Sequence, residues 1–170
     1  QVRSEPIRGF GAQLKDWQVS GKSWTAKVDT SLWGGLTIKA PLPGIHNISN
    51  LCQAIACTMA LVRDQELEAS KEQVVQAIES FSGVHRRLED LGSYAGVQLF
   101  EDFAHHPTAV GAVISTCRHM YPKGRIIVAF EIRNATSRRN VLQEYFVRAF
   151  QGADWVLLGP VPEDSRLSVA

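Results

Sequence analysis

The sequence predicts a mixed α/β protein in which a β-hairpin and helices precede a Rossmann-like, mostly parallel sheet. Strand and helix patterns alternate in the order β-α-β-α-β between residues 97 and 158, the order of a parallel sheet with crossover helices. Residues 125–130 hold a continuous apolar run, as expected of a parallel strand covered on both faces. Residues 14–40, by contrast, alternate around short turns, which is typical of antiparallel strands.

The first predicted elements are strands at residues 17–19 and 24–28, where apolar positions alternate on both sides of a turn. A third strand is expected at residues 36–38. The turn triplet 21–23, Gly-Lys-Ser, resembles the end of a phosphate-binding loop. Asp16 stands where that motif requires a glycine, and a strand pattern follows, so we assign the triplet to the hairpin turn.

Two helices are expected next. The first covers roughly residues 49–61, where apolar residues gather on one face. The second begins at Ser70, and Gln73 three residues later completes a capping-box pattern. Gly83 follows Ser82 at its predicted end, since glycine is favoured just past a helix C-terminus. We place a domain boundary between residues 82 and 83.

The second half of the chain opens with strands and then alternates. Pro107 begins a helix in which apolar residues recur at i, i+3, i+4 and i+7, the spacing of one helix face. The predicted elements are strands at 88–94, 97–100, 125–130 and 155–158, and helices from Pro107 to about Met120 and from about 139 to 150.

Composition excludes several classes of function. A net charge of +1 over 170 residues gives no general electrostatic basis for binding nucleic acid. No apolar run approaches the roughly 18 residues that a membrane-spanning helix needs, so no membrane partner is expected. The three cysteines fit no metal-ligand spacing and indicate free thiols in a reducing cytosol. No glycine-rich dinucleotide fingerprint follows any strand.

Polar groups gather where two of the predicted strands end. Asp102, His105 and His106 follow the strand at 97–100, and Arg133 follows the apolar run at 125–130. In open α/β sheets ligands bind beyond the carboxyl ends of the strands, so these loops form a candidate binding edge. An arginine suits a carboxylate or phosphate, and imidazoles can bind an anion or relay a proton. The alternative is that Asp102 caps a helix and the histidines are solvated loop residues.

Three segments, in this order and spacing, resemble the Mur ligase family of ATP-dependent, amide-forming enzymes of peptidoglycan synthesis. They are Gly-Ile-His-Asn at 44–47, Gly-Val-His-Arg-Arg-Leu-Glu at 83–89, and Asp-Phe-Ala-His-His-Pro-Thr at 102–108. Each segment is short, and their combination is specific. The resemblance extends from about residue 36 to residue 158.

The resemblance implies that residues 1–82 are the C-terminal part of a central ATP-binding domain. Residues 83–170 would be a truncated, Rossmann-like C-terminal domain that binds the incoming amino acid or peptide. The family's UDP-sugar domain, phosphate-binding loop and magnesium ligands have no counterpart here, and the chain begins without Met. We therefore expect this chain to be a piece of a longer cytoplasmic enzyme and to be inactive by itself. The missing N-terminal and central regions are expected in the same protein.

Site residues carry over from the family position by position. Asn47 resembles the residue that binds the adenine of ATP, although it could instead be a helix N-cap. Arg87 resembles a residue that contacts the nucleotide, and Asp102 resembles the one that holds its ribose. Substrate binding is expected at His105, His106, Arg133, Asn134 and Thr136. Arg86 and Glu89 are expected to be structural partners. ATP and Mg²⁺ are the implied cofactors, with the metal ligands outside this chain, and no catalytic or metal-binding residue is assigned within it.

The implied reaction joins an amine to UDP-N-acetylmuramate through an acyl phosphate. Phe-Glu-x-Arg-x-x-Thr at 130–136 resembles the branch that recycles the murein tripeptide L-alanyl-γ-D-glutamyl-meso-diaminopimelate, although Ile132 departs from its usual proline. The branch that adds L-alanine typically has arginines where Asn134 and Ser137 stand, and a tyrosine at Phe103. The alternatives are the L-alanine ligase and, for this chain alone, a non-catalytic nucleotide- or peptide-binding module.

Overall fold

The structure is a computed structural model that describes residues 11–132 and 140–160. The chain divides into two compact units, residues 1–84 and 85–170. The boundary predicted from the sequence, between residues 82 and 83, stands two residues earlier.

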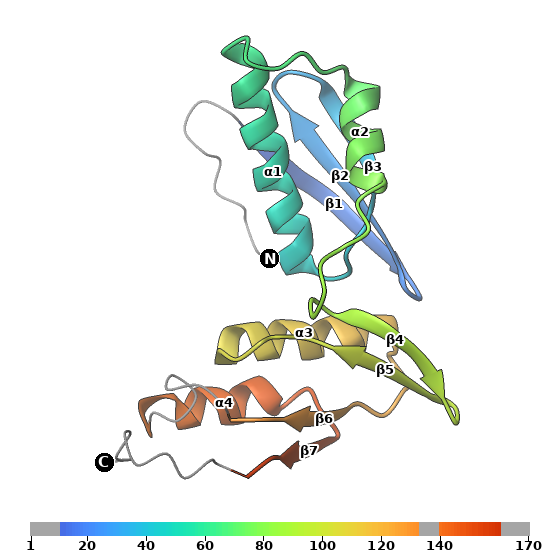
Figure 1. Cartoon of the computed structure of the whole chain (residues 1–170), viewed down its shortest axis with the longest axis vertical. Coiled ribbons are helices and arrows are strands. Elements are labelled where there is room, and N and C mark those ends of the chain that lie inside the picture. The colour runs from blue at the N-terminus through green and yellow to red at the C-terminus, as the bar shows by residue number, and fades with distance from the viewer. Residues whose placement is uncertain (1–10, 133–139, 161–170) are drawn as a thin grey trace. The chain divides into compact units, whose positions relative to one another are not determined.

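The first unit contains an antiparallel sheet of three strands in the order β1-β2-β3 (Figure 1). The strands are β1 (Ala12–Ser20), β2 (Ser23–Thr30) and β3 (Gly34–Ala40), longer than predicted but centred on the same segments. Ser20 pairs with Ser23, so the turn has two residues, and Gly21 has a φ of 57°. A glycine with positive φ at this first turn position suits a type II′ hairpin. The assignment of the Gly-Lys-Ser triplet to a hairpin is confirmed.

Two helices accompany this sheet: α1 (Ile45–Arg63) and α2 (Lys71–Glu79). Buried residues recur along α1 at helical spacing, and alternate residues of β2 and β3 are buried as well. These buried residues are Ile48, Cys52, Ile55 and Met59 on the helix, and Trp24, Ala26, Val28, Leu36 and Ile38 on the strands. The hydrophobic core of the first unit is thus formed by one face of the sheet and one stripe of α1.

The ends of both helices differ from the predicted ones. α1 begins at Ile45, four residues early, because Gly44 takes the N-cap position with a φ of 102°. The capping box of α2 is confirmed: the Ser70 side chain accepts from the Gln73 backbone, and the Gln73 side chain accepts from Ser70 N–H. α2 ends at Glu79, before the predicted Ser82-Gly83 stop.

α1 bears on the expectation that no segment spans a membrane. By length and composition it is long and apolar enough to cross a membrane. That property is weak evidence, because core helices of globular proteins share it. The apolar stripe of α1 lies in the core of the first unit, as described above.

The second unit combines an antiparallel pair of strands, which α3 follows, and a parallel pair whose two strands are separated in the chain by α4. Its elements are β4 (Glu89–Tyr94), β5 (Val97–Glu101), α3 (Pro107–Met120), β6 (Ile127–Phe130), a 3-10 turn η1 (Asn140–Leu142), α4 (Gln143–Phe150) and β7 (Trp155–Leu158). The predicted α/β class and the β-α-β-α-β order from β5 to β7 are confirmed. β6 pairs with β7 in parallel, as expected of a crossover unit.

The pairing of β5 departs from the predicted mostly parallel sheet. Among the described residues, β5 is hydrogen-bonded to β4 in an antiparallel hairpin and not to β6. The cause is a two-residue turn in which Ala95 and Gly96 both have positive φ, 48° and 80°. Two such residues give the tight hairpin geometry that folds one strand directly back along the other.

Aromatic rings and two packed helices form the core of the second unit. Val110 and Ile114 of α3 and Phe146 of α4 are buried together, and Phe130 at the end of β6 packs against them. The ring centroids of Phe130 and Phe146 are 5.3 Å apart, within the range of favourable aromatic pairs. α3 and α4 therefore pack against the face of β6 that carries Val128 and Phe130.

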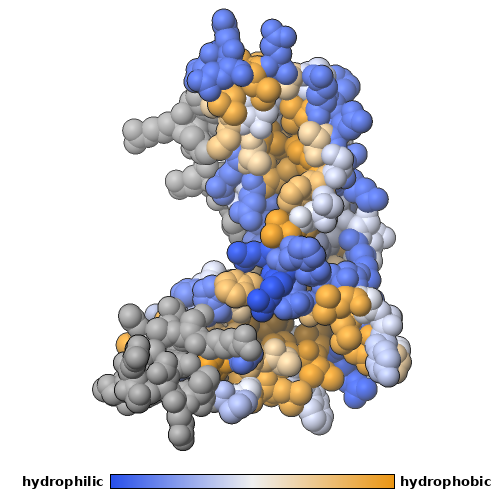
Figure 2. All heavy atoms as spheres, in the orientation of Figure 1, coloured by the Kyte–Doolittle hydropathy of each residue, from blue (hydrophilic) through white to orange (hydrophobic). Residues whose placement is uncertain are grey.

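The other face of β6–β7 is exposed in the described part of the chain. Ile127 and Trp155 lie opposite each other in the register and are 57% and 64% exposed. Figure 2 shows hydrophobic surface over this unit. The expectation that the strand at 125–130 is covered on both faces therefore does not hold for the described residues.

The capping box of α2 can be tested by changing Ser70 to Ala. We expect the free energy of unfolding of the first unit to fall by about 1 kcal/mol, because the backbone N–H of Gln73 loses its acceptor. Urea unfolding followed by tryptophan fluorescence measures this, since Trp17, Trp24 and Trp33 all lie in that unit.

The matched control for this change is Gln53→Ala on the exposed face of α1. Glutamine and alanine are both good helix formers, so the free energy of unfolding should change by less than about 0.5 kcal/mol. Equal effects of the Ser70 and Gln53 changes would contradict a stabilising cap.

Candidate functional site

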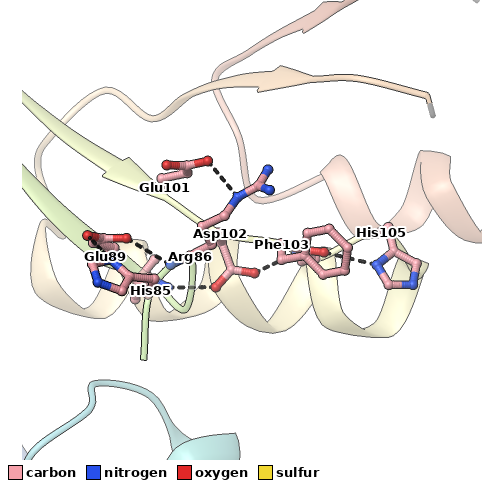
Figure 3. Close-up of polar contacts among 9 residues, drawn as sticks. His85, Arg86, Glu89, Glu101, Asp102, Phe103 and His105 are labelled. Atoms are coloured by element: carbon pink, nitrogen blue, oxygen red, sulfur yellow. Dashed lines mark hydrogen bonds and ion pairs between the residues drawn. The ribbon is translucent and has the colours of Figure 1, made fainter. Parts of the chain in front are cut away.

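A cluster of hydrogen bonds joins the first residues of the second unit to the end of β5 (Figure 3). We call it the brace, and it consists of residues 85–89 and 101–104. The Asp102 carboxylate lies at its centre: Oδ2 accepts from Leu88 N–H at 2.7 Å, and Oδ1 accepts from Ala104 N–H at 2.6 Å. Asp102 therefore joins two backbone segments and does not cap α3, which corrects the alternative interpretation of this residue.

Arg86 makes a second set of contacts in the brace. Its Nε donates to Glu101 Oε1 at 2.8 Å, and its guanidinium carbon lies 5.2 Å from the centroid of the Phe103 ring. Its backbone carbonyl accepts from Phe103 N–H at 2.8 Å. A guanidinium above an aromatic face and paired with a carboxylate satisfies both preferences of arginine. Arg86 is thus bound within the unit.

Glu89 closes the brace from the start of β4. One carboxylate oxygen accepts from Arg86 N–H at 2.8 Å, and the other lies 3.0 Å from His85 Nδ1. The Arg86 amide, followed by the hydrogen bond to His85, holds the pKa of Glu89 below its ordinary value. Arg86 and Glu89 are structural partners, as the sequence predicts.

Arg87 differs from both of its neighbours. Arg86 and Leu88 have positive φ values of 59° and 48°, which residues with a side chain adopt infrequently. Leu88 is buried, and Arg87 is exposed. Among residues 11–132 and 140–160, no hydrogen bond or ion pair involves the Arg87 side chain. Its guanidinium is thus available to a ligand.

The two histidines both leave Nε2 for a ligand, but in opposite hydrogen-bonding roles. His105 Nδ1 lies 2.9 Å from the Phe103 carbonyl, so this nitrogen carries the proton, and the neutral ring leaves Nε2 as an acceptor. His106 is the N-cap of α3, and its Nδ1 accepts from Thr108 N–H at 3.4 Å. Its Nε2 therefore carries the proton in the neutral form. The pair can offer one acceptor and one donor.

The thiols of the described residues are free, and one lies close to this site. Burial, and to a smaller extent the negative charge of Asp102, raise the pKa of Cys117 to about 11. Its thiol is protonated at neutral pH and is a poor nucleophile or metal ligand. In the described part of the chain, no group of three or more His, Cys, Asp or Glu side chains could hold a metal ion.

Asn47 lies in the other unit, within the first turn of α1. Its Nδ2 donates to the Pro43 carbonyl at 2.7 Å, and Gly44 takes the N-cap position. The alternative that Asn47 caps the helix is therefore wrong. The hydrogen bond orients the amide group and leaves Oδ1 with no partner among the described residues.

The ends of β5 and β6 meet the same core cluster. Ala104, just after β5, and Phe130, at the end of β6, both pack against Val110, Ile114 and Phe146. Figure 1 draws the arrowheads of β5, β6 and β7 pointing the same way. The predicted substrate residues of the second loop, Arg133, Asn134 and Thr136, lie outside the described residues.

Glu101 contributes an ion pair with Arg86 to the brace, and no sequence pattern singled it out. It pairs with Glu89 across the β4–β5 hairpin, which places two like charges on opposite strands. Such a pair is destabilising unless a cation lies nearby, and Arg86 supplies that cation. A prediction of the β4–β5 register from the sequence would have placed Glu101 opposite Glu89.

A mixed α/β domain with polar loops after its strands belongs to the class of Rossmann-like ligand-binding domains. Residues 86–168 match the family described as "Mur ligase, glutamate ligase domain", and this part of the chain belongs to that family.

Among curated relatives, the chain is similar to the UDP-N-acetylmuramate–L-alanine ligase of Allorhizobium ampelinum, with 40% identity over 121 residues, 71% of this chain and 24% of the relative. It also resembles the crystal structure of UDP-N-acetylmuramate-alanine ligase MurC from Thermotoga maritima, with a TM-score of 0.68, 25% identity, and 88% and 32% of the two chains covered.

A murein peptide ligase structure from Psychrobacter arcticus shares the fold, with a TM-score of 0.52, 23% identity, and 86% and 29% of the two chains covered. The chain spans 24% to 30% of the length of such curated relatives.

Replacing Asp102 by Ala tests the centre of the brace. Two backbone amides lose a charged acceptor, so we expect the free energy of opening at Leu88 and Ala104 to fall by about 2–4 kcal/mol. Amide hydrogen exchange by NMR measures this residue by residue. Glu144→Ala is the control, because its ion pair with Arg148 is exposed and 4.0 Å long, and should change exchange by under about 0.5 kcal/mol. Unaltered protection of the Leu88 amide would contradict the brace.

Proposed function

We propose that this chain is part of an ATP-dependent ligase that joins an amine to the muramate carboxylate of UDP-N-acetylmuramate, with L-alanine as the amine. The observation that carries the proposal is the family match over residues 86–168, combined with relatives of up to 40% identity named for that reaction. The bond formed is an amide, and the carboxylate is activated as an acyl phosphate by ATP.

The proposal assigns residues 1–82 to the end of the central ATP-binding domain and residues 83–170 to the C-terminal domain. It places the protein in the cytoplasm, where UDP-linked precursors and ATP are available. The Gly-Lys-Ser triplet forms a hairpin turn. The proposal therefore assigns the phosphate-binding loop to another part of the protein. The described residues hold no group of three or more His, Cys, Asp or Glu side chains that could bind a metal ion, and the proposal assigns the Mg²⁺ ligands to another part of the protein. By itself, the chain would bind ligands without catalysis.

Three residues would contact the nucleotide. The free Oδ1 of Asn47 would accept from the adenine amino group. The exposed Arg87 side chain would bind phosphate oxygens, for which a guanidinium fork is suited. Each Asp102 oxygen accepts one backbone N–H and retains a lone pair, which would hold a ribose hydroxyl. This part of the site would supply orientation and effective concentration.

The histidines and the second loop would hold the incoming amine substrate. The His105 Nε2 lone pair would accept a proton from the ammonium group, which must become a neutral amine before it attacks the acyl phosphate. His106 would donate from Nε2 to a carboxylate. Arg133, Asn134 and Thr136 would complete the binding of that carboxylate, with the arginine as the charged partner.

A second candidate amine is the murein tripeptide. The observation that favours it is the segment 130–137, in which Asn134 and Ser137 replace the two arginines expected of an alanine-adding enzyme. A larger peptide with several carboxylates would be held by a different set of cations. The relatives and this segment therefore point to different amines on the same acceptor.

A comparative amine assay decides between them. The full-length protein would be given ATP, UDP-N-acetylmuramate and either L-alanine or the tripeptide, with phosphate release as the measurement. We expect kcat/KM for L-alanine to exceed that for the tripeptide by about tenfold or more, since a specific carboxylate site discriminates by at least ~1.4 kcal/mol. A reversed ratio would establish the tripeptide as the substrate, and no phosphate release with either amine would refute the ligase proposal.

Arg133→Ala in the same protein tests the amine-binding loop. We expect the KM for the amine to rise about tenfold or more, while the KM for ATP changes less than about twofold, because the arginine binds the amine's carboxylate. Arg148→Ala, on the exposed side of α4, is the matched control and should leave both constants unchanged. Equal increases in the two KM values would contradict the assignment.

A further inference from the structure

The backbone around Arg87 is held in an unfavourable conformation. Arg86 and Leu88, on either side of it, both have positive φ. For residues with a side chain this conformation costs about 1 kcal/mol or more each. Two such residues separated by one would relax to an ordinary loop unless other groups held them in place.

Those groups are carboxylates on either side of the turn. Glu89 accepts from Arg86 N–H at 2.8 Å, and Asp102 accepts from Leu88 N–H at 2.7 Å. The buried Leu88 side chain adds an apolar anchor. Every one of these contacts fixes a residue beside Arg87, whose own side chain remains exposed. The strained backbone at Arg86 and Leu88 therefore sets the direction in which the Arg87 side chain leaves the turn.

Glu89 can be separated from ligand binding, whereas Asp102 cannot. Asp102 is itself proposed to hold the ribose. The Glu89 oxygens are engaged with the Arg86 amide and with His85, and its side chain is 29% exposed. Its carboxylate is therefore directed inward at the turn, and any effect of Glu89 on the nucleotide passes through the backbone at Arg86.

We propose that Glu89 is a positioning residue for Arg87: by holding the Arg86 amide it fixes the turn that directs the Arg87 guanidinium toward the nucleotide phosphates. This inference rests on the proposed function, in which Arg87 contacts ATP. It assigns to Glu89 an effect on ATP binding that a residue serving only the stability of the β4–β5 hairpin would lack.

A double-mutant cycle on the full-length protein tests the proposal. Arg87→Ala should raise the KM for ATP about tenfold, the loss of a charged phosphate contact. Glu89→Ala should raise it about three- to tenfold, with kcat and the KM for UDP-N-acetylmuramate unchanged. The double variant should be no worse than Arg87→Ala, because Glu89 acts only through that side chain. Glu144→Ala, an exposed carboxylate on α4, is the control and should leave all constants unchanged.

Glu89→Gln keeps the test decisive if the alanine variant folds poorly. Its amide oxygen can still accept from Arg86 N–H, so the KM for ATP should stay within about twofold of the unmodified protein. An increase as large as that of alanine would overturn the proposal, as would multiplying effects of the Arg87 and Glu89 changes or a loss of kcat in Glu89→Ala. If Arg87→Ala alone leaves the KM for ATP unaltered, the nucleotide role of Arg87 in the proposed function fails instead.

Discussion

Two backbone amides, Leu88 N–H and Ala104 N–H, share the carboxylate of Asp102, and this shared acceptor holds the start of β4 against the end of β5. Hydrogen bonds to an ionised acceptor are about twice as strong as neutral ones. Together with the Glu89 carboxylate, which accepts from Arg86 N–H, they offset the cost of positive φ at Arg86 and Leu88. Without Asp102, Leu88 N–H would lose its acceptor, and only Glu89 and the buried Leu88 side chain would hold the turn that presents Arg87.

In the proposed function, the same contacts relate folding to ligand binding. Arg86 is bound to Glu101 and Phe103, whereas the adjacent Arg87 is left exposed, so two neighbouring arginines have separate roles. Asp102 serves the fold through one lone pair on each oxygen, and in the proposed function its remaining lone pairs would hold the ribose. A residue with both functions is difficult to interpret from a single substitution. Glu89 holds the fold and is not proposed to contact the ligand, so its substitution separates the effect of the fold from the effect of ligand contact.

Sequence patterns within a few residues predicted the hairpin turn, the helix cap and the helix start. Contacts between residues far apart in the sequence could not be predicted in this way. The hairpin turn at Gly21, the capping box at Ser70 and the helix start at Pro107 each depend on neighbours within four residues, and each was correct. The antiparallel partner of β5 was missed in the predicted sheet, because the turn there uses Ala95, a residue that seldom has positive φ. In the site, the clustering of Asp102 and the histidines was visible in the sequence. The Asp102 contact with Leu88 spans 14 residues, and no periodicity encodes it.

The position of the brace also limits where the polypeptide can be divided. All of its donors and acceptors lie between residues 85 and 104, on the C-terminal side of the boundary between the units. A separately expressed second unit would keep every partner if it began at residue 85. A second unit that began at residue 90 would lack Arg86 and Leu88. The Glu101 carboxylate would then lose the Arg86 guanidinium, and the Asp102 carboxylate would lose Leu88 N–H.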